Sequence, residues 1–305
     1  MFLRQFHYVV ALEHECHFGR AAKRCNVSQP TLSSGIKQLE EELGIPIILR
    51  HQKFQGFTAE GKRVVEWSKR LLADRAAMVE ELAIMRDTMH GRLRIGAMPM
   101  SSPLLPLVSR LFNARHPLVQ MDVQFLGFDQ MIQGLKNFEL DVGITYLDQR
   151  QPLDGYETMP LYEKSLSLLL PDNDWLGDVK TTTWKDAAQL PLCLLSPFMH
   201  ERQIMDEAFS KAGCSPRPQL ESNSILQLAF HVMSGDVATV VPQHFSRTNN
   251  GFHGTREILL KSPVVSQQIG LVWANGTPIQ PMAKAAVELL EEAAKSGQLK
   301  ESFNK

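Results

Sequence analysis

The stretch F-G-R-A-A-K-R-C-N-V-S-Q-P-T-L-S-S-G-I-K-Q-L-E, residues 18–40, predicts two short helices joined by a tight turn. Ser28 follows the break at Asn26-Val27 and is placed to cap a helix that opens with Gln29-Pro30, because serine caps well and proline is tolerated in the first turn. The apolar residues of this helix step by four, three and four and so form one inward stripe: Leu32, Ile36, Leu39 and Leu43. Small polar side chains are left on its outer face.

This arrangement is typical of a helix-turn-helix, whose second helix enters the DNA major groove. A helix fits that groove when its contacting face is not bulky, and hydroxyl, amide and ammonium groups there reach base edges and phosphates. The residues predicted to face DNA on this helix are Gln29, Pro30, Thr31, Ser33, Ser34 and Lys37. A three-helix packing module without DNA has the same geometry, so that alternative stays open at this point.

The segments that follow predict a small strand pair and a long helix. Gly44 is placed to end the second helix, and Ile47–Arg50 and Phe54–Thr58 favour two short strands around His51-Gln52-Lys53. Residues 59–88 contain no proline and one glycine near the start, which predicts a single long helix. Its apolar residues recur at threes and fours, a seam that favours dimerisation: Val64, Trp67, Leu71, Met78, Leu82, Met85 and Met89.

From residue 91 the chain alternates between strands and helices, which predicts an α/β fold built on a parallel sheet. The expected strands are Leu93–Met98, Met121–Leu126, Leu140–Tyr146, Ser165–Leu170, Leu192–Leu195, Gln219–Asn223, Ala238–Val241 and Gln268–Ala274. The expected helices are Pro103–Arg115, Phe128–Asn137, Thr183–Ala188, Arg202–Ala212, Ile225–Met233 and Pro278–Ala294.

Composition limits the class of protein. A chain of 305 residues, 44% hydrophobic and 21% charged, is typical of a soluble globular protein long enough for two domains. Its 32 basic and 33 acidic residues give a net charge of -1, so only the local balance of residues 1–58, 7 basic minus 5 acidic residues or +2, favours a nucleic-acid partner. The four cysteines form no C-x-x-C pattern. Without an export signal or a membrane-length apolar run, we expect a cytoplasmic protein with no membrane partner.

Several motifs together resemble LysR-type transcriptional regulators. The run A-A-x-x-C-N-V-S-Q-P-T-L-S-x-x-I-K-Q-L-E-E-E-L-G at residues 21–44, the strands ending in F-T-A-E-G and the long helix are similar to the family's winged helix-turn-helix. The motifs G-R-L-R-I-G, L-D-V-G-I and V-x-x-G-x-x-x-x-x-V-P resemble its periplasmic-binding-protein-like effector domain. The resemblance covers nearly the whole chain.

The resemblance implies a regulator that binds promoter DNA as a dimer of dimers, a homotetramer, and responds to a small co-inducer between two effector lobes. RNA polymerase is a further expected contact, and no cofactor is expected. The DNA contacts then extend to the wing, at Arg50, His51 and Lys53. Where family members often carry a long basic or amide side chain this chain has Ser34, followed by Gly35, so base readout would depend on Gln29, Ser33 and Lys37.

The implied organisation has three parts. Residues 1–58 form a winged helix-turn-helix domain, and residues 59–90 form a linker helix that dimerises. Residues 91–305 form the effector domain, with a first lobe at 91–163 and 268–305 and a second lobe at 164–267.

The effector site is predicted in loops that follow strands and precede helices. In M-P-M-S-S-P, residues 98–103, Ser102 is placed to cap a helix that starts at Pro103, and free N–H groups at a helix N-terminus attract a carboxylate or oxyanion. The partly apolar lining favours a small organic acid. A purely structural role for the two serines, a solvated His200 and a surface salt bridge at Arg202 are the alternatives from the residues alone. The predicted lining is Met100, Ser101, Ser102, Phe128, Thr145, Ser196, Phe198, His200, Arg202 and Asn223.

Three other functions compete with this interpretation. An enzyme would need a G-x-S-x-G elbow, a glycine-rich phosphate loop or a His/Cys cluster at metal spacing, and the sequence has none, so no catalytic or metal-binding residue is predicted. An exported solute-binding protein would need an export signal and no helix-turn-helix. A redox-sensing member of the same family is the remaining alternative, through Cys193 and Cys214. His200 and Phe209 stand roughly where the peroxide-responsive branch has its thiols, and Cys193 is expected in a buried strand.

Overall fold

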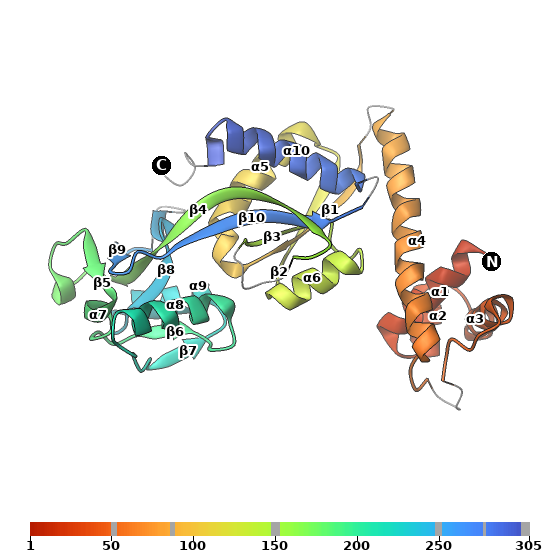
Figure 1. The fold of residues 1–305 in the computed structure, drawn as a ribbon, viewed down its shortest axis with the longest axis horizontal. Helices are drawn as coiled ribbons and strands as arrows, with labels where there is room; N and C mark the ends of the chain where they lie inside the picture. Colours follow the sequence, from red (N-terminus) through yellow and green to blue (C-terminus); the bar gives the residue numbers. More distant parts are fainter. Residues whose placement is uncertain (50–53, 86–88, 148–152, 248–251, 277–278, 300–305) are drawn as a thin grey trace. The chain divides into compact units, whose positions relative to one another are not determined.

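The protein is described by a computed structural model over residues 1–49, 54–85, 89–147, 153–247, 252–276 and 279–299 (Figure 1). Its contacts divide the chain into two compact units, one made of Met1–Met89 with Lys136–Glu139 and the other of the remaining residues from His90 onward. The first unit changes to the second between Met89 and His90. The boundary predicted between the linker helix and the effector domain, between residues 90 and 91, lies one residue further along the chain.

The first unit is helical. It contains α1 (Leu3–Glu15), α2 (Phe18–Arg24), α3 (Gln29–Leu43) and α4 (Ala59–Ile84). As predicted, Ser28 caps α3, its Oγ accepting the Thr31 N–H at 3.3 Å, and Gly44 ends the helix with φ at 69°. Leu32, Ile36 and Leu39 of the predicted inward stripe pack with apolar side chains of α1 and α2 into one core, which also takes in Ile47 and Val65. Leu43, in the last turn, is 38% exposed, so the prediction of an inward position is wrong for this residue.

Two contacts fix α3 in this core. Gly35 lies so close to α1 that a Cβ on it would come 2.8 Å from the ring of Tyr8. The buried Glu40 carboxylate accepts the N–H groups of Ile47 at 2.7 Å and Ile48 at 3.1 Å, which ties the segment after α3 to the helix. In the described part of the predicted strand pair, the pairing is a single antiparallel bridge between Ile48 and Phe57.

The second unit is a mixed α/β structure. Its strands are β1 (Gly91–Ala97), β2 (Val119–Phe125), β3 (Val142–Tyr146), β4 (Tyr156–Pro171), β5 (Thr181–Thr183), β6 (Cys193–Leu195), β7 (Leu220–Ser222), β8 (Thr239–Pro242), β9 (Thr255–Lys261) and β10 (Ser266–Ala274). Its α-helices are α5 (Leu105–Arg115), α6 (Phe128–Lys136), α7 (Trp184–Ala187), α8 (His200–Lys211), α9 (Ile225–Met233) and α10 (Pro281–Lys295). Short 3₁₀ helices are η1 (Pro99–Leu104), η2 (Asp174–Leu176) and η3 (Phe245–Arg247).

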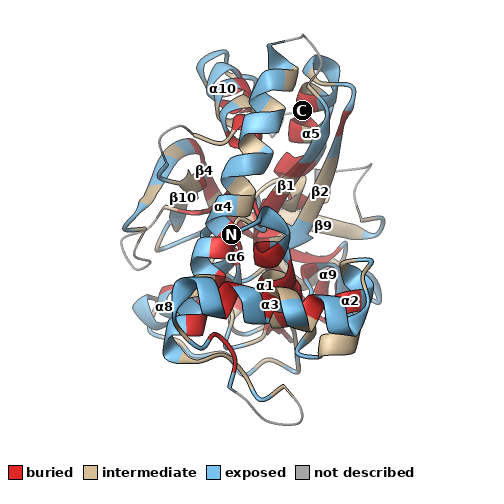
Figure 2. Ribbon diagram, turned by 90° about the vertical axis from the view of Figure 1, so that its right-hand side faces the viewer, coloured by how far each residue is buried: buried red, intermediate tan, exposed pale blue. Residues whose placement is uncertain are grey.

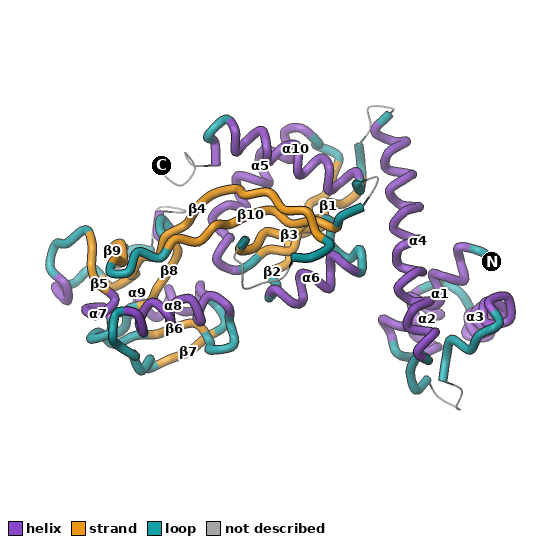
Figure 3. Tube along the Cα trace, viewed as in Figure 1, coloured by secondary structure: helices purple, strands orange, loops and turns teal. Residues whose placement is uncertain are grey.

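The main sheet is mixed, so the prediction of a parallel sheet is wrong for half of it. The strand order is β2-β1-β3-β10-β4-β9-β5, with β8 also paired to β4. Strand β1 is parallel to β2 and β3, whereas β10 is antiparallel to both β3 and β4, and β4 is antiparallel to β8 and β9. Strands β4 and β10 run side by side in opposite directions over most of the length of this unit (Figure 3), and antiparallel neighbours need no helical crossover.

The two long strands connect the lobes. The predicted lobe changes, between residues 163 and 164 and between 267 and 268, both fall inside them. In the first lobe, α5 and α10 cover one face of the sheet and α6 the other (Figure 1). Buried residues, coloured red, recur along α5, α10 and β1 (Figure 2). Strands β5 and β9 were not predicted from the sequence; β9 pairs antiparallel with β4, and β5 pairs parallel with β9.

Candidate nucleic-acid interface and ligand cavity

The outer face of α3 is polar and open to solvent. Of the six residues predicted to face DNA, Ser33 is half-buried and the other five are exposed. The Thr31 and Ser28 hydroxyls lie 2.8 Å apart, so the Thr31 hydroxyl takes part in the helix cap. Lys37 Nζ lies 3.6 Å from Glu41 Oε1, with both side chains about two-thirds exposed (64% and 66%). Such a surface pair contributes less than about 1 kcal/mol, so a phosphate can replace Glu41 as the partner of Lys37.

Two arginines of α2 are held by Glu15 at the end of α1. On α2, Arg24 Nη1 lies 3.2 Å from Glu15 Oε1, and Arg20 Nη2 donates to the Glu15 carbonyl oxygen at 2.6 Å. Lys37 is the only lysine or arginine on α3. The predicted wing contacts Arg50, His51 and Lys53 lie outside the described residues.

Helix α4 exposes the apolar seam that the sequence predicted. Exposed fractions are 55% for Trp67, 39% for Leu71, 55% for Met78 and 53% for Leu82. The helix ends at Ile84, so Met85, 77% exposed, and Met89 lie beyond it. Val64, at the other end of the seam, packs against the core of the first unit. A large exposed apolar stripe of this kind is typical of a surface that another protein covers.

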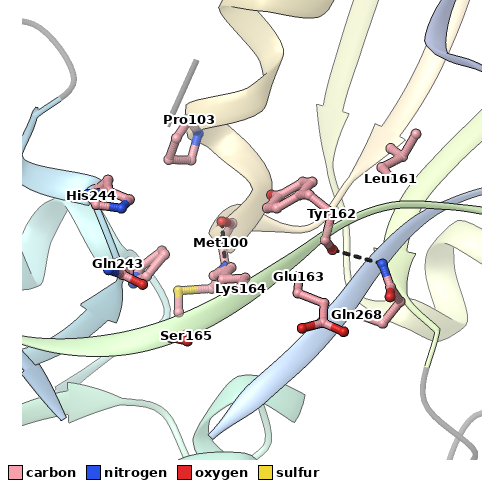
Figure 4. Close-up of a pocket in the computed structure, with 11 residues that line it drawn as sticks. Met100, Pro103, Leu161, Tyr162, Glu163, Lys164, Ser165, Gln243, His244 and Gln268 are labelled. Carbon is pink, nitrogen blue, oxygen red and sulfur yellow. Dashed lines mark hydrogen bonds between the residues drawn. The ribbon is translucent and has the colours of Figure 1, made fainter. Parts of the chain in front are cut away.

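The second unit contains a cavity of about 550 Å³ where the two lobes meet (Figure 4). Segments from η1, β4, β10 and the turn after β8 form its walls. The lining residues are Met100, Pro103, Leu161, Tyr162, Glu163, Lys164, Ser165, Pro242, Gln243, His244 and Gln268. Lys164 is the only lysine or arginine among these described residues.

The Lys164 side chain is buried, with 6% exposure. Its Nζ donates one hydrogen bond, to the Met100 carbonyl oxygen at 2.7 Å (Figure 4), and lies 6.0 Å from the centre of the Tyr146 ring. Burial lowers the pKa of Lys164 to about 7, and the carboxylate of Glu201 opposes that shift. An anion bound beside this amine would raise the pKa again and keep the group protonated at neutral pH.

A narrower recess lies beside the cavity. It is lined by Met100, Tyr146, Lys164, Leu166, Glu201, Ile204 and Gln267. Glu201 stands in the first turn of α8 and is 5% exposed. Its Oε1 has no hydrogen-bond partner among the described residues. The recess is too narrow to hold a water molecule, so the buried carboxylate and the buried amine lie on the walls of a closed space.

Of the predicted effector residues, Met100 alone lines the cavity or the recess; the role of the others stays a prediction. In the first lobe, the Ser101 hydroxyl is buried and donates to the Met98 carbonyl oxygen at 2.7 Å, and the Thr145 hydroxyl donates to Met98 Sδ at 3.3 Å. Ser102 lies inside η1, so the prediction that it caps a helix starting at Pro103 is wrong. Phe128 opens α6 and is half-buried.

In the second lobe the predicted residues are spread over the surface and the core. Phe198 is 76% exposed, Asn223 is exposed and Ser196 is half-buried. The ring of His200 lies 5.1 Å from that of Tyr146, close to the recess. Arg202 is buried and committed to protein partners: it donates to the Leu195 carbonyl oxygen at 2.6 Å and pairs with Asp206 and Glu221. An arginine so fully bonded has little left to offer a ligand.

Lys164 and Glu201 were not predicted from the sequence. Lys164 precedes the strand expected at Ser165–Leu170, whereas β4 begins at Tyr156, so the lysine lies in the middle of a long strand. It shares a strand face with Tyr162 and Leu166, both buried, and a lysine on such a face is a usable signal, because lysine is seldom fully buried without a partner. That it meets Glu201, 37 positions later, depends on tertiary packing.

The cysteines of this unit are shielded. Burial raises the pKa of the Cys193 thiol to about 11, and burial also raises the pKa of Cys214. Cys193 Sγ lies 3.7 Å from the Leu228 carbonyl oxygen and Cys214 Sγ 3.3 Å from that of Phe209. Neither has the lowered pKa that a reactive thiol needs.

The described residues provide neither a metal-binding cluster nor a membrane-spanning helix. They contain no group of three or more His, Cys, Asp and Glu side chains that could hold a metal ion. Within the same ranges, none of the helices combines the length and apolar character required to cross a bilayer.

Comparison with known proteins gives the family. Residues 3–62 match the bacterial regulatory helix-turn-helix protein, lysR family, and residues 86–295 match the LysR substrate binding domain. The hydrogen peroxide-inducible genes activator of Haemophilus influenzae is 28% identical over 298 residues, covering 97% of this chain and 98% of the relative. A full-length OxyR variant from Pseudomonas aeruginosa aligns with a TM-score of 0.74 at 26% identity, over 97% of this chain and 95% of that one. Full-length CbnR, solved in complex with its target DNA, shares the fold with a TM-score of 0.68 at 22% identity, over 96% and 100% of the two chains. The chain therefore belongs to the LysR family of DNA-binding transcriptional regulators.

Proposed function

We propose that this regulator binds promoter DNA in the cytoplasm through α3 and the wing, and that a small organic acid in the cavity between the lobes controls that binding. The single observation that carries the ligand part is Lys164, a buried amine with one hydrogen bond on the wall of a 550 Å³ cavity. Pockets of about 300–1,000 Å³ with a few placed polar groups are typical of small-ligand sites. The protein acts as a regulator, without catalysis.

The DNA contacts are proposed on the outer face of α3. Gln29 and Ser33 stand where base edges are read, and Lys37 stands where a phosphate is bound. Ser34, Thr31 and Pro30 have short side chains that allow the helix to approach the groove floor. The wing residues 50–53 would add phosphate contacts beside the groove, and contact with RNA polymerase would follow at the promoter.

Assembly is proposed through two different apolar surfaces. The seam of α4 would pair two chains into a dimer. Helix α9 carries a second exposed stripe at i, i+4 and i+7, formed by Leu226 (49%), Phe230 (53%) and Met233 (42%). Two separate self-complementary surfaces on one chain are what a dimer of dimers needs.

The ligand would act by bridging the lobes. Met100 and Pro103 of the cavity wall belong to the first lobe, residues 242–244 belong to the second, and Lys164 lies on β4, which passes through both. A ligand that contacts both lobes favours one lobe arrangement over others, because it binds that arrangement more tightly. The shift would change the spacing of the DNA-binding helices in the tetramer.

Redox sensing is the second candidate, since two relatives of this chain are named as hydrogen peroxide-inducible genes activators. The raised pKa of Cys193 and Cys214 argues against it, and His200 and Phe209 occupy the positions where the peroxide-responsive branch was expected to have its thiols. Mild peroxide followed by mass spectrometry tests it: a Cys193–Cys214 disulfide that alters DNA binding would favour this second candidate.

The main proposal is tested with the full-length protein and fluorescently labelled DNA. We expect it to bind the fragment upstream of its own gene more tightly than a random fragment of equal length. We also expect at least one small acid to raise the melting temperature by mass action and to change that affinity. No preference for the upstream fragment, with or without acids, would contradict the DNA part, and no thermal shift with any acid would contradict the ligand part.

A further inference from the structure

Helix α2 carries most of the positive charge in the described part of residues 1–58. Five of the seven lysines and arginines of this segment are described, and three of those five lie on α2, which has no acid of its own. Arg20, Lys23 and Arg24 are exposed and stand at i, i+3 and i+4, so they share one face of the helix. The two alanines between them are buried in the core and hold this basic face outward.

The two arginines are held side by side over one carboxylate. Glu15, at the end of α1, has Oε1 3.2 Å from Arg24 Nη1 and Oε2 3.5 Å from Arg20 Nε. His14 Nδ1 lies 3.3 Å from the same Oε1, and Arg20 Nη2 donates to the Glu15 carbonyl oxygen at 2.6 Å. The Glu15 side chain is 21% exposed, against 62% for Arg20 and 53% for Arg24. The guanidinium groups therefore lie outside the carboxylate, and an approaching anion meets them first.

Both arginines keep donors for a further acceptor. A guanidinium group has five N–H donors in a planar fork. Within the described part of the chain, Arg20 Nη1 and Arg24 Nη2 donate no hydrogen bond. The three cations of α2 and the single charge of Glu15 give this group a net charge of +2. Glu15 therefore orients the two forks without neutralising the basic face, and a phosphate oxyanion fits such forks in charge and in geometry.

The first turn of α2 borders the end of α3 that is proposed to read bases. A Cβ on Gly19 would come 3.6 Å from Gln29 Oε1, so the starts of the two helices lie next to each other, and Arg20 follows Gly19 directly. In a helix-turn-helix the first helix crosses the DNA backbone while the second lies in the major groove. We propose that Arg20 and Arg24, oriented by Glu15, bind phosphates of the strand that borders the groove occupied by α3. This inference rests on the proposed function and adds a second group of DNA contacts to those of α3 and the wing.

The test measures how DNA binding by the full-length protein depends on salt. The double variant Arg20→Ala, Arg24→Ala is titrated by fluorescence anisotropy against the fragment upstream of its own gene and against a random fragment of equal length. Each phosphate contact contributes about 0.9 to the slope of log affinity against log salt, so we expect the slope to fall by about 2 on both fragments. The loss of affinity should be about 10-fold larger at about 50 mM than at about 200 mM salt. The preference for the upstream fragment should remain, because phosphate contacts do not read sequence.

Two further variants separate a local contact from net charge. The double variant Lys284→Ala, Lys295→Ala removes two positive charges from exposed ion pairs on α10, so it matches the change in net charge and should leave the slope unchanged. The double variant Arg20→Lys, Arg24→Lys keeps the charges and loses the forks. We expect it to keep the slope of the unsubstituted protein, with an affinity between those of the unsubstituted protein and the alanine variant.

The outcomes distinguish this inference from the proposed function. An unchanged slope in the alanine variant of α2, with circular dichroism unchanged, would overturn the inference, while a preserved preference for the upstream fragment would leave the proposed function standing. An equal fall in slope in the α10 variant would also overturn the inference, because the effect would then be one of net charge. A full-length protein that binds neither fragment would contradict both.

Discussion

The outer face of α3 and the Lys164–Glu201 recess represent two ways of building a site. The first consists of residues 29–37 of one helix and is exposed to solvent. The buried residues on the opposite side of α3 hold the helix in place. The second is made from η1, β3, β4 and α8, is buried, and contains charges that the protein itself does not fully pair. An exposed polar face can be changed with little effect on stability, whereas a buried amine links ligand binding to stability and to pH.

The largest expected effect concerns α4, which is exposed like α3 but apolar. Replacing Trp67 and Met78 together by Glu puts two charges into the seam, and we expect the dimer to separate and DNA affinity to fall by about 100-fold or more. Sedimentation and fluorescence anisotropy at fixed salt measure the two effects. The double variant Ala59→Glu, Ala76→Glu adds the same charge at exposed positions off the seam, and it should remain dimeric. A dimeric seam variant would show that α4 is not the contact.

The buried amine predicts a pH dependence that the α3 face should lack. Because the pKa of Lys164 is about 7 in the folded chain and near its ordinary value of 10.5 when unfolded, the unfolded state binds more protons between these values. Stability therefore rises with pH in this window, at most about 1.4 kcal/mol per pH unit.

Lys164→Met removes that contribution. Between pH 7.5 and 9.5, the free energy of unfolding of the unsubstituted protein should rise by about 2 to 3 kcal/mol relative to the variant, measured by urea denaturation. Lys37→Met serves as the control, because Lys37 is 64% exposed and should give parallel curves. If the difference in unfolding free energy between the unsubstituted protein and Lys164→Met stays constant from pH 7.5 to 9.5, the Lys164 amine is not buried as described.

On α3 itself, two neighbouring positions should respond in opposite ways. Gly35→Ala places a Cβ 2.8 Å from the Tyr8 ring, so we expect a loss of about 1 to 2 kcal/mol in unfolding free energy. Ser34→Ala, on the exposed side, should be neutral or slightly stabilising, because alanine has the higher helix propensity. Chemical denaturation followed by circular dichroism compares them. A Ser34→Ala loss as large as that of Gly35→Ala would mean that α3 is not oriented with Ser34 outward.

The sequence predicted the first site better than the second for a physical reason. Helix caps and apolar periodicity act within about four residues, so Ser28, Gly44 and the stripe from Leu32 to Leu39 identify α3 and its outer face directly. The helices of the second unit were also found, with Ile225–Met233 matching α9 at both ends. Local periodicity does not determine whether neighbouring strands run parallel or antiparallel. The prediction of a parallel sheet is therefore wrong for β4 and β10.

The recess depends on contacts that no local pattern encodes. Met100, Lys164 and Glu201 come together because η1, β4 and α8 all contribute walls to the recess, and no pattern within one segment shows that its residue meets the other two. The loop after β1 was expected to present a capped helix N-terminus, but η1 occupies those residues and turns the Ser101 hydroxyl toward Met98. A strand-to-helix junction therefore identified the region of the site but not the groups within it.

The smallest expected effect tests whether the α3 face works through charge as well as shape. Lys37→Ala should weaken binding to all DNA sequences by a similar factor and reduce the slope of log affinity against log salt by about 1, because one phosphate contact is lost. Gln38→Ala, exposed on the same helix, is the control and should leave the slope unchanged. Anisotropy titrations between about 50 and 200 mM salt resolve this difference. An unchanged slope in Lys37→Ala would mean that Glu41 keeps Lys37 in the complex, and the phosphate contacts would then have to come from α2 and the wing.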